Sequence, residues 1–544
     1  MQEYPHVGQP SALLIKHLFD RALLWSPQQI IVYRDLREMT YREFYQRVQR
    51  LANVLVGLGV GPGDKVGVMD WDSHRYLELY FAVPMIGAVL HTVNIRLSLE
   101  QTAFTIHHAG DKVLFVHTDF VPLAEGLAAQ LPSVRQRVWL SDDPQPGPSP
   151  LVCAGEYETL LGAASPNFQF PDFDENTVAT MFYTTGTTGD PKGVFFSHRQ
   201  LVLHTLSGTA ALGAYRDPIS INVDDVYMPL TPMFHVHGWG VPYIATMLGM
   251  KQVYPGRYEP AMLLRLIAQH RVSFSHCVPT IIQMLLNHPA SKEIDFSMLK
   301  LIIGGAPLSK GLAQQAMARG IRIAGGYGMS ETCPIVAASH IKPEHAQGAP
   351  EERLDFLTRT GLPLPLVQVA VWSPDGKPLA TGPENVGELV LQCPWLTQGY
   401  YRSPETSEAL WSGGWLHTGD IAYMDSDGYI RIIDRMKDVV KIGGEWISSL
   451  ELENALSQHP AVREVAVFGV PDSKWDEHPR AHVVLHEAAR GTTTPKELFK
   501  HLHGFIDRGA IHKRAILTEI VLVDAVPKTS VGKVDKKELR KQYA

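Results

Sequence analysis

The stretch that decides how the chain is organised is Thr184-Thr185-Gly186-Thr187-Thr188-Gly189-Asp190-Pro191-Lys192-Gly193. Its glycines allow a tight turn that brings backbone N–H groups close to an anion. The threonine hydroxyls and Lys192 add hydrogen-bond donors and a positive charge to the same loop. The apolar, aromatic residues 178–183 before it predict a strand that fixes where the loop begins. We interpret the stretch as a phosphate-binding loop for ATP, although it is not a Walker A motif, and the alternative is a polar surface loop.

Length and composition limit the class of protein. At 544 residues the chain exceeds one ordinary hydrophobic core, so at least two domains are expected. A net charge of -7 argues against a nucleic-acid-binding protein. The cysteines are scattered without a Cys-x-x-Cys pair, which predicts a reducing compartment. No signal-peptide pattern opens the chain, and its most apolar early run, 80–90, is too short to span a bilayer. We therefore expect a cytoplasmic protein without stable membrane insertion.

The order of predicted elements indicates an α/β fold. Thr40-Tyr41-Arg42-Glu43 is a capping box that opens a helix, and helices then alternate with short apolar strands up to about residue 335. This alternation predicts mostly parallel sheets that helices cover on both faces. Polar residues 341–357 are expected to form a long loop. From about residue 368, short strands separated by turn signals predict a small, distorted β-barrel, and a compact α+β domain follows.

A second motif is Gly326-Tyr327-Gly328-Met329-Ser330-Glu331-Thr332. Glycines around one tyrosine leave an aromatic face accessible for stacking a planar base. Glu331 offers a hard oxygen ligand of the kind that Mg²⁺ prefers in nucleotide sites. The alternative is a glycine turn in which Ser330 caps a helix.

Three further motifs lie toward the C-terminus. Asp420 follows Thr418-Gly419 just before a predicted strand, where an aspartate is more often a turn former. The glycines of Lys441-Ile442-Gly443-Gly444-Glu445-Trp446 would let the backbone line a narrow channel. Pro527-Lys528-Thr529-Ser530-Val531-Gly532-Lys533 has the composition of a basic, solvated tail.

Together these motifs resemble the adenylate-forming superfamily, which comprises acyl-CoA synthetases, luciferases and peptide-synthetase adenylation domains. They occur in the family order from Thr184 to Lys533. The resemblance implies a large N-terminal domain, residues 1–434, and a small mobile C-terminal domain, residues 435–544. It also implies three small molecules at the site: ATP, Mg²⁺ and coenzyme A.

The resemblance assigns roles residue by residue. It implies that Lys533, Glu331 and Lys192 are catalytic, that Thr184 and Glu331 bind the metal, and that Gly443 and Gly444 contact coenzyme A. Tyr327 would stack on adenine, Asp420 and Arg435 would hold the ribose, and Lys437 would be the hinge. The full set of ATP- or AMP-binding residues that it implies is Thr184, Thr185, Gly186, Thr187, Thr188, Gly189, Lys192, His235, Gly305, Gly326, Tyr327, Gly328, Ser330, Asp420, Arg435, Lys437, Lys441 and Trp446.

The stretch Pro232-Met233-Phe234-His235-Val236-His237-Gly238-Trp239-Gly240 bears on the substrate. Adenylation domains for amino acids carry an aspartate where this chain has His235, so an amino acid is disfavoured. His235 and His237 lack a third ligand at fitting spacing, which disfavours a metal site. The residues expected to line an apolar acyl pocket are Phe234, His235, Trp239, Tyr243, Val278 and Gly305. Each buried methylene contributes about 0.8 kcal/mol, which favours a fatty chain. The alternative for Trp239 is an ordinary core aromatic.

The sequence therefore predicts an AMP-forming ligase that joins a medium- or long-chain fatty acid to coenzyme A through an acyl-AMP. One alternative is an adenylate-forming enzyme for a branched or aromatic acid, or with an acceptor other than coenzyme A. Another is a non-catalytic lipid- or nucleotide-binding relative, which is disfavoured because every assigned charged residue is present. The expected partners are small molecules; nucleic acid is not expected, and a homodimer is left open.

Overall fold

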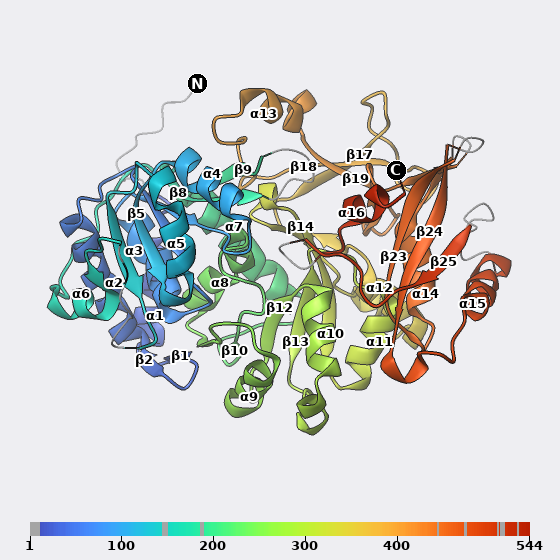
Figure 1. Cartoon of the computed structure of the whole chain (residues 1–544), viewed down its shortest axis with the longest axis horizontal. Coiled ribbons are helices and arrows are strands. Elements are labelled where there is room, and N and C mark those ends of the chain that lie inside the picture. The colour runs from blue at the N-terminus through green and yellow to red at the C-terminus, as the bar shows by residue number, and fades with distance from the viewer. Residues whose placement is uncertain are drawn as a thin grey trace, which may run out of the picture.

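The computed structural model describes residues 11–143, 149, 151–184, 190–442, 445–472, 476–508, 511, 517–529 and 533–543. Most of the chain forms one large region built on two helix-covered sheets (Figure 1). The last hundred or so residues form a smaller region at the right of the view, beside the large one (Figure 1). No helix in the described part of the chain is long and apolar enough to cross a membrane.

The first sheet has seven strands in the order β7-β6-β5-β3-β4-β8-β9, and its pairs are parallel except for the β8–β9 hairpin. Its strands are β3 (Lys65–Met69), β4 (Val89–Thr92), β5 (Asp111–His117), β6 (Gln136–Leu140), β7 (Gly155–Glu156), β8 (Val178–Thr184) and β9 (Lys192–Ser197). The helices of this part are α1 (Lys16–Trp25), α2 (Tyr41–Gly57), α3 (His74–Met85), α4 (Leu99–Ala109), α5 (Val121–Leu127) and α6 (Tyr157–Ala163). The predicted capping box is confirmed: the Thr40 N–H donates to Glu43 Oε2 over 2.7 Å, and Thr40 Oγ1 accepts from the Glu43 N–H over 3.2 Å.

The second sheet has nine strands in the order β16-β15-β14-β13-β12-β10-β11-β1-β2. They are β1 (Ile30–Tyr33), β2 (Arg37–Thr40), β10 (Val226–Tyr227), β11 (Lys251–Tyr254), β12 (Phe274–Cys277), β13 (Lys300–Gly304), β14 (Arg322–Gly328), β15 (Ile335–Ala338) and β16 (Leu362–Pro363). The central strands are parallel and the edges antiparallel. Its helices are α7 (His198–Ala214), α8 (Val241–Leu248), α9 (Pro260–His270), α10 (Pro279–Asn287), α11 (Lys310–Ala318) and α12 (Pro350–Thr358).

The loop predicted over residues 341–357 is wrong in part, because α12 begins at Pro350 within it. A proline fits the first helical turn, where its missing N–H has no intrahelical acceptor, and Glu351 and Glu352 favour the same turn through the helix dipole. Short 3₁₀ turns also occur at Thr118–Phe120, Ala128–Gln130, Val236–Gly240 (η3), Pro289–Glu293, Ser330–Thr332 (η5), Pro343–His345, Ser412–Gly414 and Glu487–Ala489.

The predicted β-barrel is an open sheet of four antiparallel strands. These are β17 (Gln368–Trp372), β18 (Gly387–Gln392), β19 (Leu416–Met424) and β20 (Ile430–Arg435), with α13 (Pro404–Leu410) between β18 and β19. A barrel closes when its outer strands pair with each other. Among the described residues β17 and β20 do not pair, and Ile430 at the edge of β20 bridges to Gly361 instead.

The C-terminal region is built on a fourth sheet, with strand order β22-β21-β24-β23 and β25 added beside β24. Its elements are β21 (Val440–Ile442), β22 (Glu445–Ile447), β23 (Val462–Asp472), β24 (Asp476–Leu485), β25 (Glu519–Leu522), α14 (Ser449–Ser457), α15 (Pro495–Asp507) and α16 (Lys536–Lys541). The change from the third sheet to the fourth falls between β20 and β21. The domain limits 1–434 and 435–544 stay predictions.

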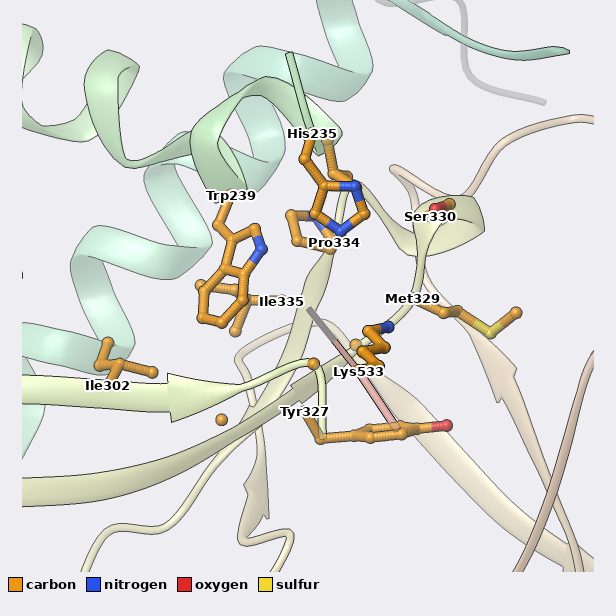
Figure 2. A pocket seen from close by; sticks show the side chains of 13 residues that line it. His235, Trp239, Ile302, Tyr327, Met329, Ser330, Pro334, Ile335 and Lys533 are labelled. Carbon is orange, nitrogen blue, oxygen red and sulfur yellow. The ribbon is translucent and has the colours of Figure 1, made fainter. Parts of the chain in front are cut away.

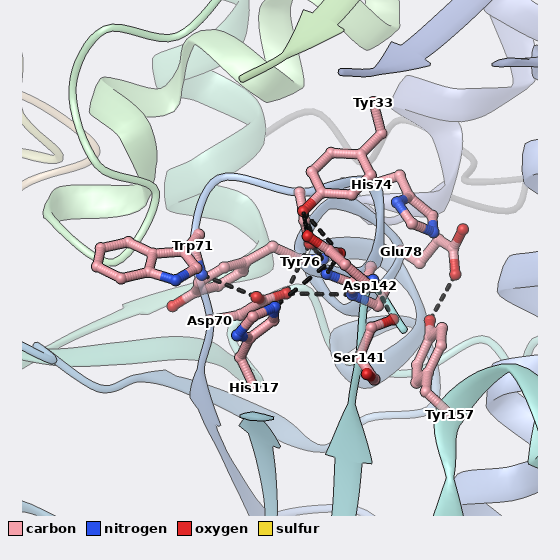
Figure 3. Close-up of polar contacts among 12 residues, drawn as sticks. Tyr33, Asp70, Trp71, His74, Tyr76, Glu78, His117, Ser141, Asp142 and Tyr157 are labelled. Atoms are coloured by element: carbon pink, nitrogen blue, oxygen red, sulfur yellow. Dashed lines mark hydrogen bonds and ion pairs between the residues drawn. The ribbon is translucent and has the colours of Figure 1, made fainter. Parts of the chain in front are cut away.

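A buried polar network joins the helices of the first sheet, and Figure 3 shows its Glu78–Tyr157 contact together with Asp142 nearby. The Arg47 guanidinium donates to both Glu78 (2.6 Å) and Glu158 (2.7 Å), and the Tyr157 hydroxyl donates to Glu78 over 2.5 Å. Nearby, Arg75 donates to Asp142 over 2.9 Å. Charged side chains are stable in such a place only when paired. The network therefore ties α2, α3 and α6 together in one arrangement.

Candidate active site

A small cavity lies where the parallel strands of the second sheet end, the usual location of ligand sites in α/β folds. It measures about 40 Å³. Its walls are His235, Val236, Trp239, Ile302, Gly305, Gly326, Tyr327, Gly328, Met329, Ser330, Pro334, Ile335 and Lys533 (Figure 2). Eight of the predicted site residues therefore come together here from distant parts of the sequence: His235, Trp239, Gly305, Gly326, Tyr327, Gly328, Ser330 and Lys533.

The backbone of β14 comes very close to its neighbours beside this cavity. A Cβ atom on Gly328 would lie 1.9 Å from the carbonyl oxygen of Pro334, far inside any contact distance. The close approach leaves the ring of Tyr327 at the wall of the cavity (Figure 2). The glycine requirement proposed for this motif thus has a steric cause.

Tyr327, Asp420 and Arg435 form a polar cluster beside the cavity. The Tyr327 hydroxyl donates to Asp420 Oδ2 over 2.7 Å, and Arg435 Nε lies 3.5 Å from Asp420 Oδ1. Asp420 and Arg435 face each other across the β19–β20 pair, so Asp420 lies within a strand and not just before one. Burial raises the pKa of Asp420, and the positive charge of Arg435 opposes that shift.

Lys533 enters the cavity, with Tyr327 and His235 on either side of it in Figure 2. Burial, and then the positive charge of Arg435, lowers its pKa to about 8, while Asp420 and Glu331 act in the opposite direction. Burial, followed by the Lys533 charge, lowers the pKa of His235 to about 3. His235 is therefore neutral near pH 7, and Lys533 is the charged group among the described cavity walls.

The segment that carries His235 and Trp239 is fixed through its backbone. The Met233 N–H donates to Asp72 Oδ1 over 2.8 Å, and the Phe234 carbonyl accepts from Thr92 Oγ1 over 3.0 Å. Directly afterwards Val236, His237 and Trp239 adopt positive φ values of 49°, 54° and 58°. Such values are unusual for non-glycine residues and are found mostly where surrounding structure enforces them. The unusual backbone turns the Trp239 indole onto the cavity.

The residues predicted for the acyl pocket separate into two groups. Trp239 packs against His276 with 5.2 Å between ring centroids, and Val278 lies beside Gly305, 3.3 Å from where a Cβ would be. Tyr243 stacks on Tyr80 in the core with a centroid distance of 5.5 Å, and neither it nor Phe234 lines the cavity. An acyl role for these two residues stays a prediction.

Thr184 and Lys192 stand opposite each other at the base of the β8–β9 hairpin. The phosphate-loop residues between them, Thr185, Gly186, Thr187, Thr188 and Gly189, lie outside the described residues. Glu331 is 7% exposed, and its Oε1 accepts a hydrogen bond from the Tyr400 hydroxyl over 2.7 Å. No cluster of three or more His, Cys, Asp or Glu side chains suited to a metal occurs among the described residues. One buried carboxylate fits Mg²⁺, which takes few protein ligands when phosphates supply the others.

The remaining predicted residues follow the third sheet in the sequence. Lys437 follows β20, and partial burial, then the Arg435 charge, lowers its pKa. Lys441 lies in β21, where its backbone N–H donates to Glu477 Oε2 over 2.8 Å. Gly443 and Gly444 lie outside the described residues, as does the side chain of Trp446. Their assigned contacts with nucleotide or coenzyme A stay predictions.

Several residues at the site were missed by the sequence analysis. Met329, Pro334 and Ile335 line the cavity because β14 and β15 pair around a turn, and Ile302 reaches it from β13. The sequence analysis also did not predict Tyr400 as a site residue. It lies in a loop without periodic pattern, and it contacts Glu331, which is far away in the sequence. Only the position of residues 329 and 334 next to a glycine motif could have signalled a role.

Comparisons with known proteins agree with this geometry. Residues 19–401 match the family model "AMP-binding enzyme", and residues 451–533 match "AMP-binding enzyme C-terminal domain". A long-chain-fatty-acid–CoA ligase of Thermus thermophilus is 39% identical, with 100% of this chain and 98% of the relative covered. A 3-methylmercaptopropionyl-CoA ligase of Ruegeria pomeroyi is 35% identical, with 98% and 97% covered. The solved structure of ATP-bound MatB from Rhodopseudomonas palustris has a TM-score of 0.81 at 26% identity, with 98% and 99% covered.

The chain therefore belongs to the AMP-binding enzyme family, among its adenylate-forming acid–CoA ligases. ATP and coenzyme A are substrates of that class.

Proposed function

We propose that the protein activates an apolar monocarboxylic acid, a fatty acid of medium or long chain, with ATP and Mg²⁺. The acid and ATP give acyl-AMP and pyrophosphate, and the coenzyme A thiol then displaces AMP to form the thioester. The observation that carries the proposal is the position of Lys533: a single ammonium group in a cavity between an aromatic, hydroxyl-bearing wall and an apolar wall.

In the first half-reaction the described residues surround the reacting atoms. Tyr327 would stack on adenine, and Asp420 with Arg435 would bind the ribose hydroxyls. The Lys533 ammonium would neutralise the negative charge that develops as the carboxylate attacks the α-phosphate. Thr184 and Glu331 would hold Mg²⁺, which supplies further charge neutralisation at the phosphates.

The charge pattern of the cavity supports an uncharged acyl tail. Lys533 is its charged wall residue among those described, and it is needed at the carboxylate and phosphate. A second carboxylate on the substrate would be left without a partner, which is costly in an enclosed site. A monocarboxylic acid therefore fits best, and the long-chain relative at 39% identity supports a fatty acid.

The position of Trp239 at the cavity wall favours a second candidate, a short apolar acid. A longer chain enters only if the Trp239 indole moves away from His276. The relative from Ruegeria pomeroyi, a ligase named for 3-methylmercaptopropionate, is consistent with a short tail.

Initial rates of acid-dependent pyrophosphate release over a series of straight-chain acids test both candidates. The fatty-acid proposal expects kcat/KM to rise with each added methylene over the medium-chain range, by about fourfold per CH₂ if each contributes 0.8 kcal/mol. An optimum at the shortest acids would favour the second candidate. Trp239→Ala should shift the optimum to longer acids while leaving the KM for ATP unchanged, and an unchanged optimum would make Trp239 an ordinary core aromatic.

A further inference from the structure

Tyr400 contacts two charged groups: Glu331, which the proposed function assigns to Mg²⁺, and Lys192, which the family resemblance assigns to ATP. Its hydroxyl donates to Glu331 Oε1 over 2.7 Å. The Lys192 ammonium lies 4.7 Å from the centre of its ring, a cation–π distance. Glu331 and Lys192 are 139 positions apart by their numbers, 331 and 192, yet one side chain touches both.

The backbone around Tyr400 fixes this position. Tyr400 forms an antiparallel bridge with Val194, two residues after Lys192. Three residues before Tyr400, the Thr397 N–H donates to the Glu331 carbonyl over 2.9 Å. The Tyr400 N–H itself donates to Ser407 Oγ over 2.9 Å. The loop that carries Tyr400 is therefore joined both to β9 and to the Glu331 motif.

The chemistry of the tyrosine suits a role at this place. Burial, and then the negative charge of Glu331, raises the pKa of its hydroxyl, so it remains a hydrogen-bond donor at neutral pH. Among the described residues Oε1 of Glu331 is the oxygen that accepts a hydrogen bond, which leaves Oε2 for a cation. The Lys192 ammonium lies against the ring face, and no ion pair joins it to Glu331 in the described structure.

We propose that Tyr400 is a positioning residue for the magnesium–ATP complex: its hydroxyl orients Glu331, and its ring keeps Lys192 from pairing with that carboxylate. Both groups contact the same side chain, and opposite charges that approach each other attract strongly in a partly desolvated site. Without the ring, Lys192 and Glu331 would neutralise each other before the phosphates and the metal arrive. The inference rests on the proposed function, in which Glu331 holds Mg²⁺, and on the predicted binding of ATP by Lys192.

The test measures ATP binding by calorimetry as a function of Mg²⁺ concentration, with AMP as a second ligand. Tyr400→Phe keeps the ring and loses the hydroxyl, whereas Tyr400→Leu loses both. Loss of a hydrogen bond to a charged group predicts about a tenfold higher Mg²⁺ requirement for ATP binding in the Phe variant. The Leu variant should need more again, and AMP affinity should not change in either, since AMP lacks the β- and γ-phosphates.

Tyr401→Phe is the matched control, because that ring packs edge-on against His108 with 5.5 Å between centroids. It should behave as wild type. If wild type binds magnesium–ATP and both Tyr400 variants match it, the positioning role is overturned while the proposed function stands. If the Tyr400 variants lose AMP affinity by the same factor as magnesium–ATP affinity, or if their melting temperature falls together with it, Tyr400 has only a structural role. A wild type that binds no ATP would overturn the proposed function itself.

Discussion

Lys533 shows how one residue acquires its chemistry from its surroundings. A lysine in water keeps its proton up to about pH 10. Inside the cavity, burial and Arg435 lower its pKa to about 8, because the charged form has lost hydration and lies near another cation. Asp420 and Glu331 prevent a larger fall. The side chain is thus a cation near pH 7, but it loses its proton as the pH rises through about 8.

The first prediction follows from this pKa. Because the pKa is lowered, the ammonium is lost as pH rises through about 8, well before an ordinary lysine would lose its proton. The kcat/KM of adenylate formation for the free enzyme should therefore fall on the alkaline side with an apparent pKa near 8. Pyrophosphate release measured across pH 6.5 to about 9.5 checks this. Adenylate formation that stays constant to the alkaline end would show that the Lys533 charge is not needed.

At the scale of elements, the polar network behind the first sheet illustrates what holds α2 to α3. Glu78 is fully buried, and burial raises its pKa while Arg47 lowers it. The Arg47 guanidinium donates to Glu78 over 2.6 Å, and the same guanidinium also donates to Glu158. Removing one partner from such a pair leaves a buried charge without compensation.

The second prediction is that Arg47→Met destabilises this region by about 3–5 kcal/mol. The double variant Arg47→Met/Glu78→Leu should recover most of the lost stability, because the buried carboxylate that had lost its partner is then removed as well. Thr40→Ala, which removes the N-cap of the same helix, should cost only about 1 kcal/mol. Melting temperatures of the three variants give the order. If the double variant is no more stable than Arg47→Met, the charge pairing is not the cause.

Local signals predicted the elements well and the arrangement less well. The capping box at Thr40 and the strand before the phosphate loop were predictable because their determinants lie within a few residues. The helix from Pro350 was missed because its polar surface gives no hydrophobic periodicity. The open third sheet was mistaken for a barrel because strand patterns do not say whether the outer strands pair.

The same limit applies to the site. Asp420 and Lys533 could be recognised only because their short motifs resemble those of the adenylate-forming superfamily, since their composition alone indicated a turn and a solvated tail. Tyr400 and Ile302 could not, because only the fold brings them to the motif residues. Tyr243 stacks on Tyr80 outside the described cavity walls, and its predicted acyl role stays untested.

At the scale of the whole molecule, the small C-terminal region contributes Lys533 to a cavity whose other described walls belong to the large region. Contacts between the regions support this arrangement: the Lys310 N–H donates to Asn454 Oδ1 over 2.9 Å, and Gln283 Nε2 donates to the Arg463 carbonyl. The family resemblance assigns the coenzyme A contacts to Gly443 and Gly444, which lie in the same part of the sequence as Lys533. Thioester formation would therefore require the small region to turn about Lys437.

The third prediction concerns that pivot. Lys437→Pro restricts φ at one position between the third and fourth sheets. We expect it to keep adenylate formation and lose thioester formation, because the arrangement with Lys533 in the cavity is already reached. The two half-reactions are measured separately, as pyrophosphate release and as thioester formation from supplied acyl-AMP. Equal losses in both would argue against a pivot at Lys437.

The measurement that tests the central claim most directly is the pair of half-reaction rates of Lys533→Ala. Adenylate formation should fall by roughly 10²–10³-fold, as for the loss of one electrostatic donor at a transition state. Conversion of supplied acyl-AMP and coenzyme A to thioester should continue near the wild-type rate. If both half-reactions fall equally, or if adenylate formation persists, the Lys533 ammonium in the cavity does not do the chemistry assigned to it.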